Sequence, residues 1–83
     1  MSLEGERLQF QGRLGEKKLE AEKAKIKIKG LVDSLRTLLN PFVAVDDIDT
    51  DLVVEYAMDL AQLKIIYVTT MQEIVAIKKA LGK

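Results

Sequence analysis

With 83 residues, the chain is long enough for one small domain, and its apolar content of 48% excludes an intrinsically disordered tail. Its 13 basic and 13 acidic residues cancel, so no overall field attracts it to nucleic acid or to an anionic membrane. It has no cysteine and no histidine, which removes disulfides, the thiol nucleophile, the usual general base and the usual transition-metal ligands.

The sequence carries neither a signal peptide nor an uninterrupted membrane span. Its first residues, Met-Ser-Leu-Glu-Gly-Glu, lack the basic and then apolar character of a secretory signal. Farther on, Asp59, Lys64 and Glu73 interrupt the most hydrophobic stretch before it reaches about 18 uncharged residues. We therefore expect a cytoplasmic protein that has no membrane partner.

The first half of the chain has the pattern of one long coiled-coil helix. Its apolar and small residues follow a four-three spacing that Lys17 alone breaks. The series consists of Phe10, Leu14, Ala21, Ala24, Ile28, Leu31, Leu35 and Leu38. Pro41 cannot continue a helix and moves Asn40 out of the α region, so this helix is predicted to end near Leu39.

The start of this helix is less sharply defined than its end. Gly12 and Gly15 each cost about 1 kcal/mol relative to alanine in a helix. We therefore predict firm helix for about residues 16–39. Residues 1–15 are predicted to form a weakly ordered or frayed extension of it.

A connection over residues 40–49 leads into a second predicted helix at about residues 50–81. Asp47, Asp49 or Thr50 can cap its first turn, where carboxylates also favour the positive end of the helix dipole. The sequence therefore predicts two helices joined by a short acidic connection.

The acidic turn resembles the beginning of a calcium-binding loop without completing it. Asp47, Asp49 and Asp51 match the first three ligands of such a loop. Leu52, however, stands where the sharp turn needs glycine, and Met58 stands where the bidentate glutamate belongs. We therefore assign these carboxylates to helix capping and predict no metal site.

The predicted fold is all-α, an antiparallel two-helix coiled-coil hairpin that forms a single domain over residues 16–81. The second helix offers a face for the first, since its apolar residues also follow heptad spacing. The predicted hairpin core consists of Ile28, Leu31, Leu35, Leu38, Val53, Tyr56, Leu60, Leu63 and Tyr67.

The alignment of the two helices follows from the position of the connection. Setting Leu35 opposite Tyr56 centres the turn within residues 40–49 and places bulky Tyr67 opposite small Ala24. The same alignment predicts two contacts between charged residues of the helices, Lys27 with Asp59 and Arg13 with Glu73.

The second helix carries another apolar series, here called the outer seam, that a two-helix hairpin leaves uncovered. The outer seam consists of Val54, Met58, Ala61, Ile65, Val68 and Val75. At about 100° per residue its centre lies roughly 150° around the helix from the centre of the hairpin face. We therefore predict a homo-oligomer, in which a dimer joining two hairpins into a four-helix bundle is favoured. Otherwise a foreign partner helix covers the outer seam.

These features predict a non-enzymatic protein-protein interaction module with no catalytic residue and no cofactor. The alternative is a nucleic-acid-associated accessory protein that uses the basic side of the first helix between Lys17 and Arg36. This basic run contains Lys17, Lys18, Lys23, Lys25, Lys27 and Lys29. These lysines spread around the helix and have no aromatic residue among them, so the sequence favours nucleic acid less as a partner.

Overall fold

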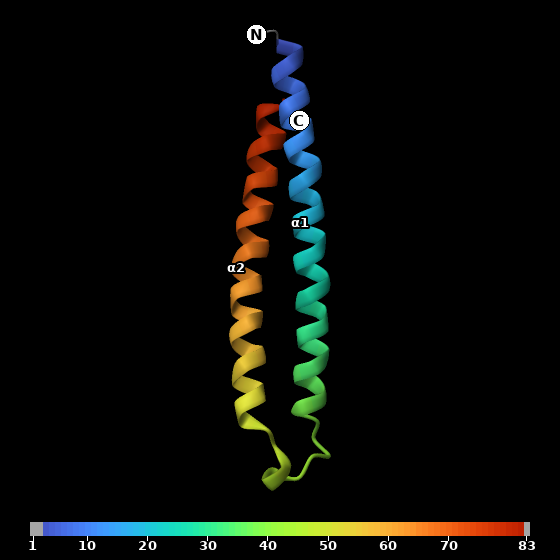
Figure 1. Cartoon of the computed structure of the whole chain (residues 1–83), viewed down its shortest axis with the longest axis vertical. Helices are drawn as coiled ribbons and strands as arrows, with labels where there is room; N and C mark the ends of the chain where they lie inside the picture. Colours follow the sequence, from blue (N-terminus) through green and yellow to red (C-terminus); the bar gives the residue numbers. More distant parts are fainter. Residues whose placement is uncertain (1–2, 83) are drawn as a thin grey trace.

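The computed structural model describes residues 3–82 and shows two long helices packed side by side as an antiparallel hairpin (Figure 1). Helix α1 (Leu3–Leu38) and helix α2 (Thr50–Ala80) are joined by a connection that contains the 3-10 turn η1 (Val45–Asp47). Residues 3–82 contain no β-strand. The predicted all-α hairpin is therefore confirmed.

Helix α1 begins upstream of the firm helix predicted for residues 16–39. It continues through Gly12 and Gly15, and its first turn carries Glu4 and Glu6 at the positive end of the helix dipole. In Figure 1 this part of α1 projects past the end of α2. Helix α1 thus includes the predicted upstream extension, because the other residues of this stretch propagate a helix past two glycines. The fraying of this extension stays a prediction, and residues 1 and 2 lie outside the described residues.

Asp49 caps α2. Its side chain accepts a hydrogen bond from the backbone N–H of Leu52 at 3.1 Å, and Asp51 adds a second carboxylate to the first turn. Of the three candidate caps, the structure selects Asp49. The far end of α2 has two lysines in its last turn and is followed by Gly82, which adopts a positive φ of 78°.

Asn40 and Pro41 turn the chain out of α1. The Asn40 side-chain oxygen accepts a hydrogen bond from the N–H of Phe42 at 2.9 Å. The Asn40 carbonyl accepts another from the N–H of Val43 at 3.0 Å. Such bonds are typical of asparagine in tight turns. The tip that they form is open, since Phe42 is 94% exposed.

The tightest packing lies toward the open end of the hairpin, away from the connection. Among the described residues, the buried ones are Ala21, Ala24, Thr70, Ile74, Ile77 and Leu81. Each residue of the predicted hairpin core is half-buried: Ile28, Leu31, Leu35, Leu38, Val53, Tyr56, Leu60, Leu63 and Tyr67. Two helices cover a large side chain from only two directions, whereas small alanines let the helices come close together.

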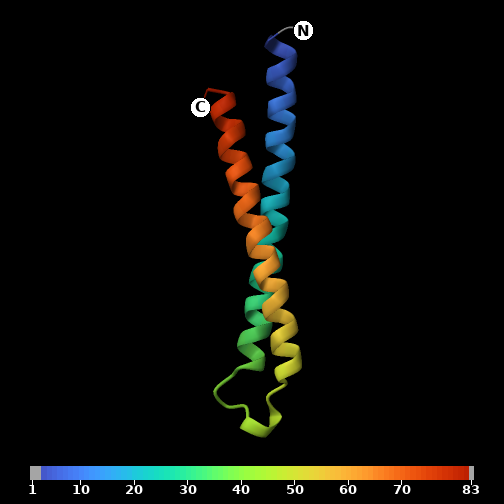
Figure 2. The ribbon, with the colours of Figure 1, turned by 90° about the vertical axis from the view of Figure 1, so that its left-hand side faces the viewer.

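The hairpin is long and thin, and its helices cross at a shallow angle (Figure 2). It measures 65 × 16 × 15 Å, and its radius of gyration of 18.8 Å compares with about 12 Å for a compact domain of this length. Its accessible surface is 6513 Å², whereas a compact monomer of 9.3 kDa exposes about 5,000 Å². The hairpin therefore exposes roughly 1,500 Å² more than such a monomer.

Candidate interaction surface

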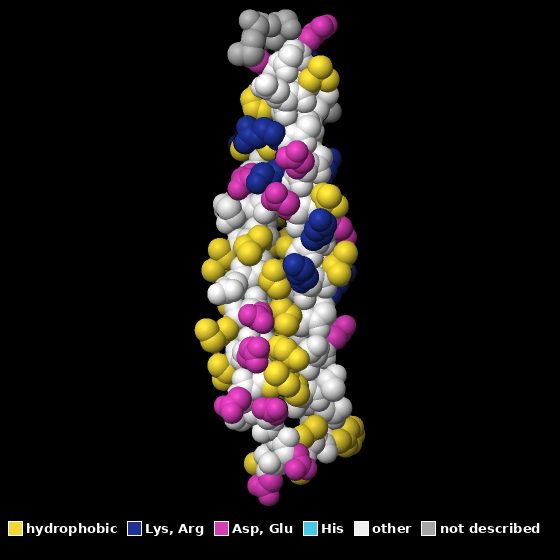
Figure 3. Space-filling model, viewed as in Figure 1, with side chains coloured by type: hydrophobic (Ala, Val, Ile, Leu, Met, Phe, Trp, Pro, Cys, Tyr) yellow, Lys and Arg dark blue, Asp and Glu magenta, His cyan; other side chains and the backbone are white. Residues whose placement is uncertain are grey.

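The outer seam follows α2 on the side that α1 leaves open. Its five large members are 40–67% exposed: Val54, Met58, Ile65, Val68 and Val75. The remaining member, Ala61, is exposed as well. Figure 3 shows apolar side chains projecting from this edge of the molecule. The structure thus places all six predicted residues of the outer seam at the surface.

A shallow apolar hollow lies in the C-terminal half of the outer seam. It has a volume of about 340 Å³ and is lined by Tyr67, Val68, Met71, Gln72 and Val75. Gln72, which interrupts the series in the sequence, is part of this lining. Met71 extends the apolar surface beyond the residues that the heptad spacing identified. An apolar side chain from another helix fits a hollow of this kind.

The two ends of α2 carry opposite charges. Asp51, Glu55 and Asp59 belong to its first half, and Lys78 and Lys79 occupy its last turn. Figure 3 shows acidic side chains on α2 near the connection and basic ones nearer the open end. This distribution matches the helix dipole and gives the surface a direction along its length.

Lys17 of α1 forms an ion pair with Glu73 of α2, the one interhelical ion pair within the described residues 3–82. Its Nζ lies 2.7 Å from Glu73 Oε2 and 3.3 Å from Glu20 Oε2. These hydrogen bonds, that of Glu73 first, raise the pKa of Lys17 above its ordinary value. The alignment had matched Glu73 with Arg13, and the structure corrects that partner. Lys17 occupies a heptad position facing α2, where its long stem covers apolar surface and its ammonium reaches outward.

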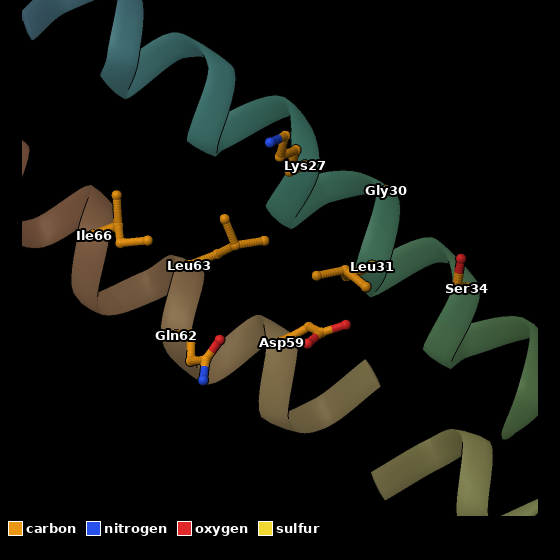
Figure 4. A pocket seen from close by; sticks show the side chains of 8 residues that line it. All are labelled: Lys27, Gly30, Leu31, Ser34, Asp59, Gln62, Leu63 and Ile66. Atoms are coloured by element: carbon orange, nitrogen blue, oxygen red, sulfur yellow. The ribbon is translucent and has the colours of Figure 1, made fainter. Parts of the chain in front are cut away.

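A groove of about 520 Å³ runs between the helices near the middle of the hairpin. It is lined by Lys27, Gly30, Leu31, Ser34, Asp59, Gln62, Leu63 and Ile66. Figure 4 shows Leu31 and Leu63 pointing toward each other across the space between the helices. Lys27 and Asp59 both line the groove, as the alignment predicts. The groove is therefore the surface of the hairpin face itself.

Helix α1 carries a further row of exposed apolar side chains that sequence reasoning missed. Leu8, Leu19 and Ile26 are 57–67% exposed. Gly12 and Gly15 lie between them, and a Cβ added at either glycine meets nothing within 4 Å. The row repeats at intervals of eleven and seven residues, a signal that the intervening glycines hide from an apolar count.

The basic run of α1 divides between two sides of the hairpin. Lys25 and Lys29 line a hollow together with Lys64 and Tyr67 of α2. Lys27, by contrast, lines the groove shown in Figure 4. Residues two positions apart lie about 160° apart around a helix, which accounts for the separation.

In the acidic connection, Asp49 serves as the N-cap of α2. Within residues 3–82, no group of three His, Cys, Asp or Glu side chains is placed to hold a metal ion. Asp49 accepts the capping hydrogen bond, and Asp47 ends the turn η1.

Helix α2 is long and apolar enough to cross a membrane by length and composition alone. Only 17% of its most apolar 18-residue window is buried inside the hairpin. Core helices of soluble proteins pass the same test, so the finding by itself is weak evidence for a membrane span.

Comparison with known proteins gives no family for the chain, because no family model, curated protein or solved structure matches it. Its function is therefore inferred from its own residues and their arrangement.

Proposed function

We propose that this chain is a non-enzymatic assembly module in which a second copy of the same chain covers the outer seam. The observation that carries this proposal is that five large apolar side chains on one helix face are 40–67% exposed. Soluble monomers rarely expose a continuous apolar patch larger than a few hundred Å². When a second copy packs on the outer seam, the outer seams of both copies are buried, and two-fold dimers are the commonest oligomers.

The total surface of the hairpin supports the proposal. The excess of roughly 1,500 Å² over a compact monomer of equal mass exceeds the area of about 800 Å² per partner that a standard interface buries. Pairing along the outer seam is therefore compatible with a stable interface. It leaves the α1 side of each hairpin free.

The charges of α2 favour an antiparallel arrangement of the two copies. A parallel pairing sets Asp51 and Lys79 beside their own counterparts and brings two acidic connections together. An antiparallel pairing sets the acidic first turn of one α2 beside the basic last turn of the other. The stem of Lys79 then covers Val54, and its ammonium reaches Asp51 of the second copy.

Heptad packing selects an alignment for this antiparallel pair. The facing residues are Met58 with Val75, Ile65 with Val68, and Ala61 with Gln72. Gln72 thus meets the smallest member of the outer seam, which leaves room for its amide to reach water. By two-fold symmetry each of these layers occurs twice.

Lipid is a poorer cover for the outer seam than protein. α1 packs along α2, and its Lys17 and Glu20 form charged contacts beside the helix that would enter the bilayer. Placing such groups at the depth of a bilayer core costs several kcal/mol. A heterologous helix satisfies the same packing but requires a second gene product.

The test is the mass of the protein in solution, measured by light scattering after size exclusion. We expect wild type at tens of micromolar to run as a dimer or larger. The variant Ala61→Glu with Val68→Glu is expected to run as a monomer, because it places carboxylates in the middle of the interface, where burying unpaired charges is costly.

The matched control is Gln62→Glu with Thr69→Glu. These residues directly follow Ala61 and Val68 in sequence and are exposed. They lie about 100° around the helix from Ala61 and Val68 and about 20–60° from Met58 and Ile65 at the border of the outer seam. The control therefore adds the same charge at the same spacing outside the centre of the outer seam, and it is expected to keep the mass of wild type. A monomeric wild type, or equal dissociation of both variants, would sink the proposal. Retention on heparin at moderate salt measures the nucleic-acid alternative separately.

A further inference from the structure

Lysines from both helices surround one hollow on the side of the hairpin opposite the groove of Figure 4. The hollow has a volume of about 260 Å³ and is lined by Lys25, Ile28, Lys29, Lys64 and Tyr67. The three lysines are exposed, whereas Ile28 and Tyr67 are half-buried. Within residues 3–82, Lys17 forms ion pairs with Glu20 and Glu73, and none of the three lysines of the hollow forms one.

These lysines belong to a longer basic side of the hairpin. On α1 the cations of this side are Lys18, Lys25, Lys29 and Arg36. They recur at intervals of seven, four and seven residues, so they lie within about 40° of one another around the helix and form a row about 27 Å long. On α2, Lys64 and Lys78 lie on one flank, and the acidic side chains of α2 lie about 100–180° away from them.

The lining of the hollow contains three lysines and no acidic residue. Nothing in the lining therefore offsets the mutual repulsion of three ammonium groups. Glu22 and Asp33 of α1 lie outside the lining, about 40–60° around the helix from the centre of the row, and with them the six cations of this side leave a net charge of +4. This positive charge acts locally although the whole chain is formally neutral, because salt screens charges beyond about 10 Å. A ligand with negative charges at regular intervals fits this side better than a single anion does.

We propose that this basic side binds the phosphate backbone of a single-stranded nucleic acid, with a base against the ring of Tyr67. The row of cations is narrow and linear, as a strand is, and an aromatic ring beside such a row provides a stacking surface for a base of any sequence. An anionic bilayer fits less well, since Ile28 and Tyr67 are half-buried beside the lysines and do not project as membrane-inserting side chains do. The proposal depends neither on the outer seam nor on dimerisation.

Fluorescence anisotropy of a labelled DNA or RNA strand of about 20 nucleotides tests the proposal. Wild type is expected to bind at low salt, with a log-log salt dependence of slope about −2, as release of counterions from three single-strand phosphates predicts. The variant Lys25→Gln with Lys29→Gln and Lys64→Gln is expected to bind at least about tenfold more weakly. Tyr67→Leu is expected to weaken binding by about tenfold while leaving the slope unchanged.

The matched control removes three positive charges from the other parts of α1, as Arg13→Gln with Lys23→Gln and Lys27→Gln. It is expected to change the affinity by less than about threefold, and circular dichroism and light scattering establish that every variant keeps its fold and mass. Equal weakening by the two triple variants, absence of binding at about 50 mM salt, or binding to anionic vesicles but not to the strand would overturn the proposal. The lysine substitutions leave the outer seam intact, whereas Tyr67 also lines the hollow of that seam, so the affinity of Tyr67→Leu is compared with wild type only at equal mass.

Discussion

Side-chain burial at corresponding heptad positions differs between the two halves of this hairpin. Ile74 and Ile77 are each 4% exposed in the half of the hairpin that contains the buried alanines of α1. Leu31 and Leu60, at corresponding heptad positions nearer the connection, are half-buried. The size of the facing residue does not explain this difference, because the alignment sets buried Ile77 opposite Leu14 and leaves Tyr67, opposite small Ala24, half-buried.

This difference predicts unequal costs for truncating the two kinds of residue. Ile77→Ala is expected to destabilise the protein by about 2–4 kcal/mol, because it removes buried atoms that neighbours cannot replace. Leu31→Ala is expected to cost about half as much, since part of its side chain is already exposed. Urea unfolding at one fixed protein concentration compares them. A larger cost for Leu31→Ala than for Ile77→Ala would show that burial does not set the contribution of these residues to stability.

Heptad spacing was sufficient to predict the antiparallel hairpin, but none of the nine residues of the predicted hairpin core is among the buried apolar residues of the described range, which are Ala21, Ala24, Ile74, Ile77 and Leu81. Depth of burial depends on the separation of the backbones, which heptad spacing within one helix does not set. The partner of Lys17 was missed for a related reason. A lysine in an apolar series reads as an interruption, whereas its stem lets it keep that position and bind Glu73 at 2.7 Å.

At the scale of the elements, the two helices differ in what fixes their limits. Asp49 determines the start of α2 by a local hydrogen bond, and Pro41 prevents α1 from continuing. Such signals depend on neighbouring residues, so the sequence was sufficient to predict these limits closely. The start of α1 depends on small propensity differences summed over many residues, so the sequence predicted the upstream extension of this helix without a sharp first residue.

Gly12 and Gly15 weaken α1 without serving a close contact within the hairpin. A Cβ at either position meets nothing within 4 Å, so Gly12→Ala and Gly15→Ala are each expected to stabilise the protein by about 1 kcal/mol. Thermal melts followed by circular dichroism measure the gain, and light scattering is expected to give an unchanged mass. A lower melting temperature combined with a smaller mass would instead show that another helix packs closely against these glycines.

Around the whole molecule, the apolar outer seam, the basic side and the groove between the helices occupy different sides of the hairpin. The outer seam lies on one edge, and the basic side and the groove of Figure 4 lie on opposite flanks. The sequence predicted the hairpin and the exposed seam, because both follow from heptad spacing within one helix. It did not predict that Lys64 and Tyr67 join Lys25 and Lys29, because that cluster depends on how α1 and α2 align in three dimensions.

Cysteine cross-linking between copies identifies which residues of two outer seams face each other. The chain has no cysteine, so an introduced pair reports without background. Disulfides form when Cα atoms lie about 4.4–6.8 Å apart. In the proposed antiparallel pair, residue 58 of one copy faces residue 75 of the other, and the two copies of residue 58 lie about 25 Å apart along α2.

The Met58→Cys and Val75→Cys proteins are mixed under mild oxidation. Mass spectrometry then identifies the cross-linked products. Antiparallel pairing through the outer seam predicts a mixed disulfide and little cross-linking of either variant alone. Val54→Cys mixed with Val75→Cys is the matched control, since both positions are on the outer seam but lie about 6 Å out of alignment, and it is expected to react less. A dimer that cross-links Met58→Cys to itself would contradict the antiparallel pairing, and a monomeric protein with no cross-link at any of these positions would contradict self-association.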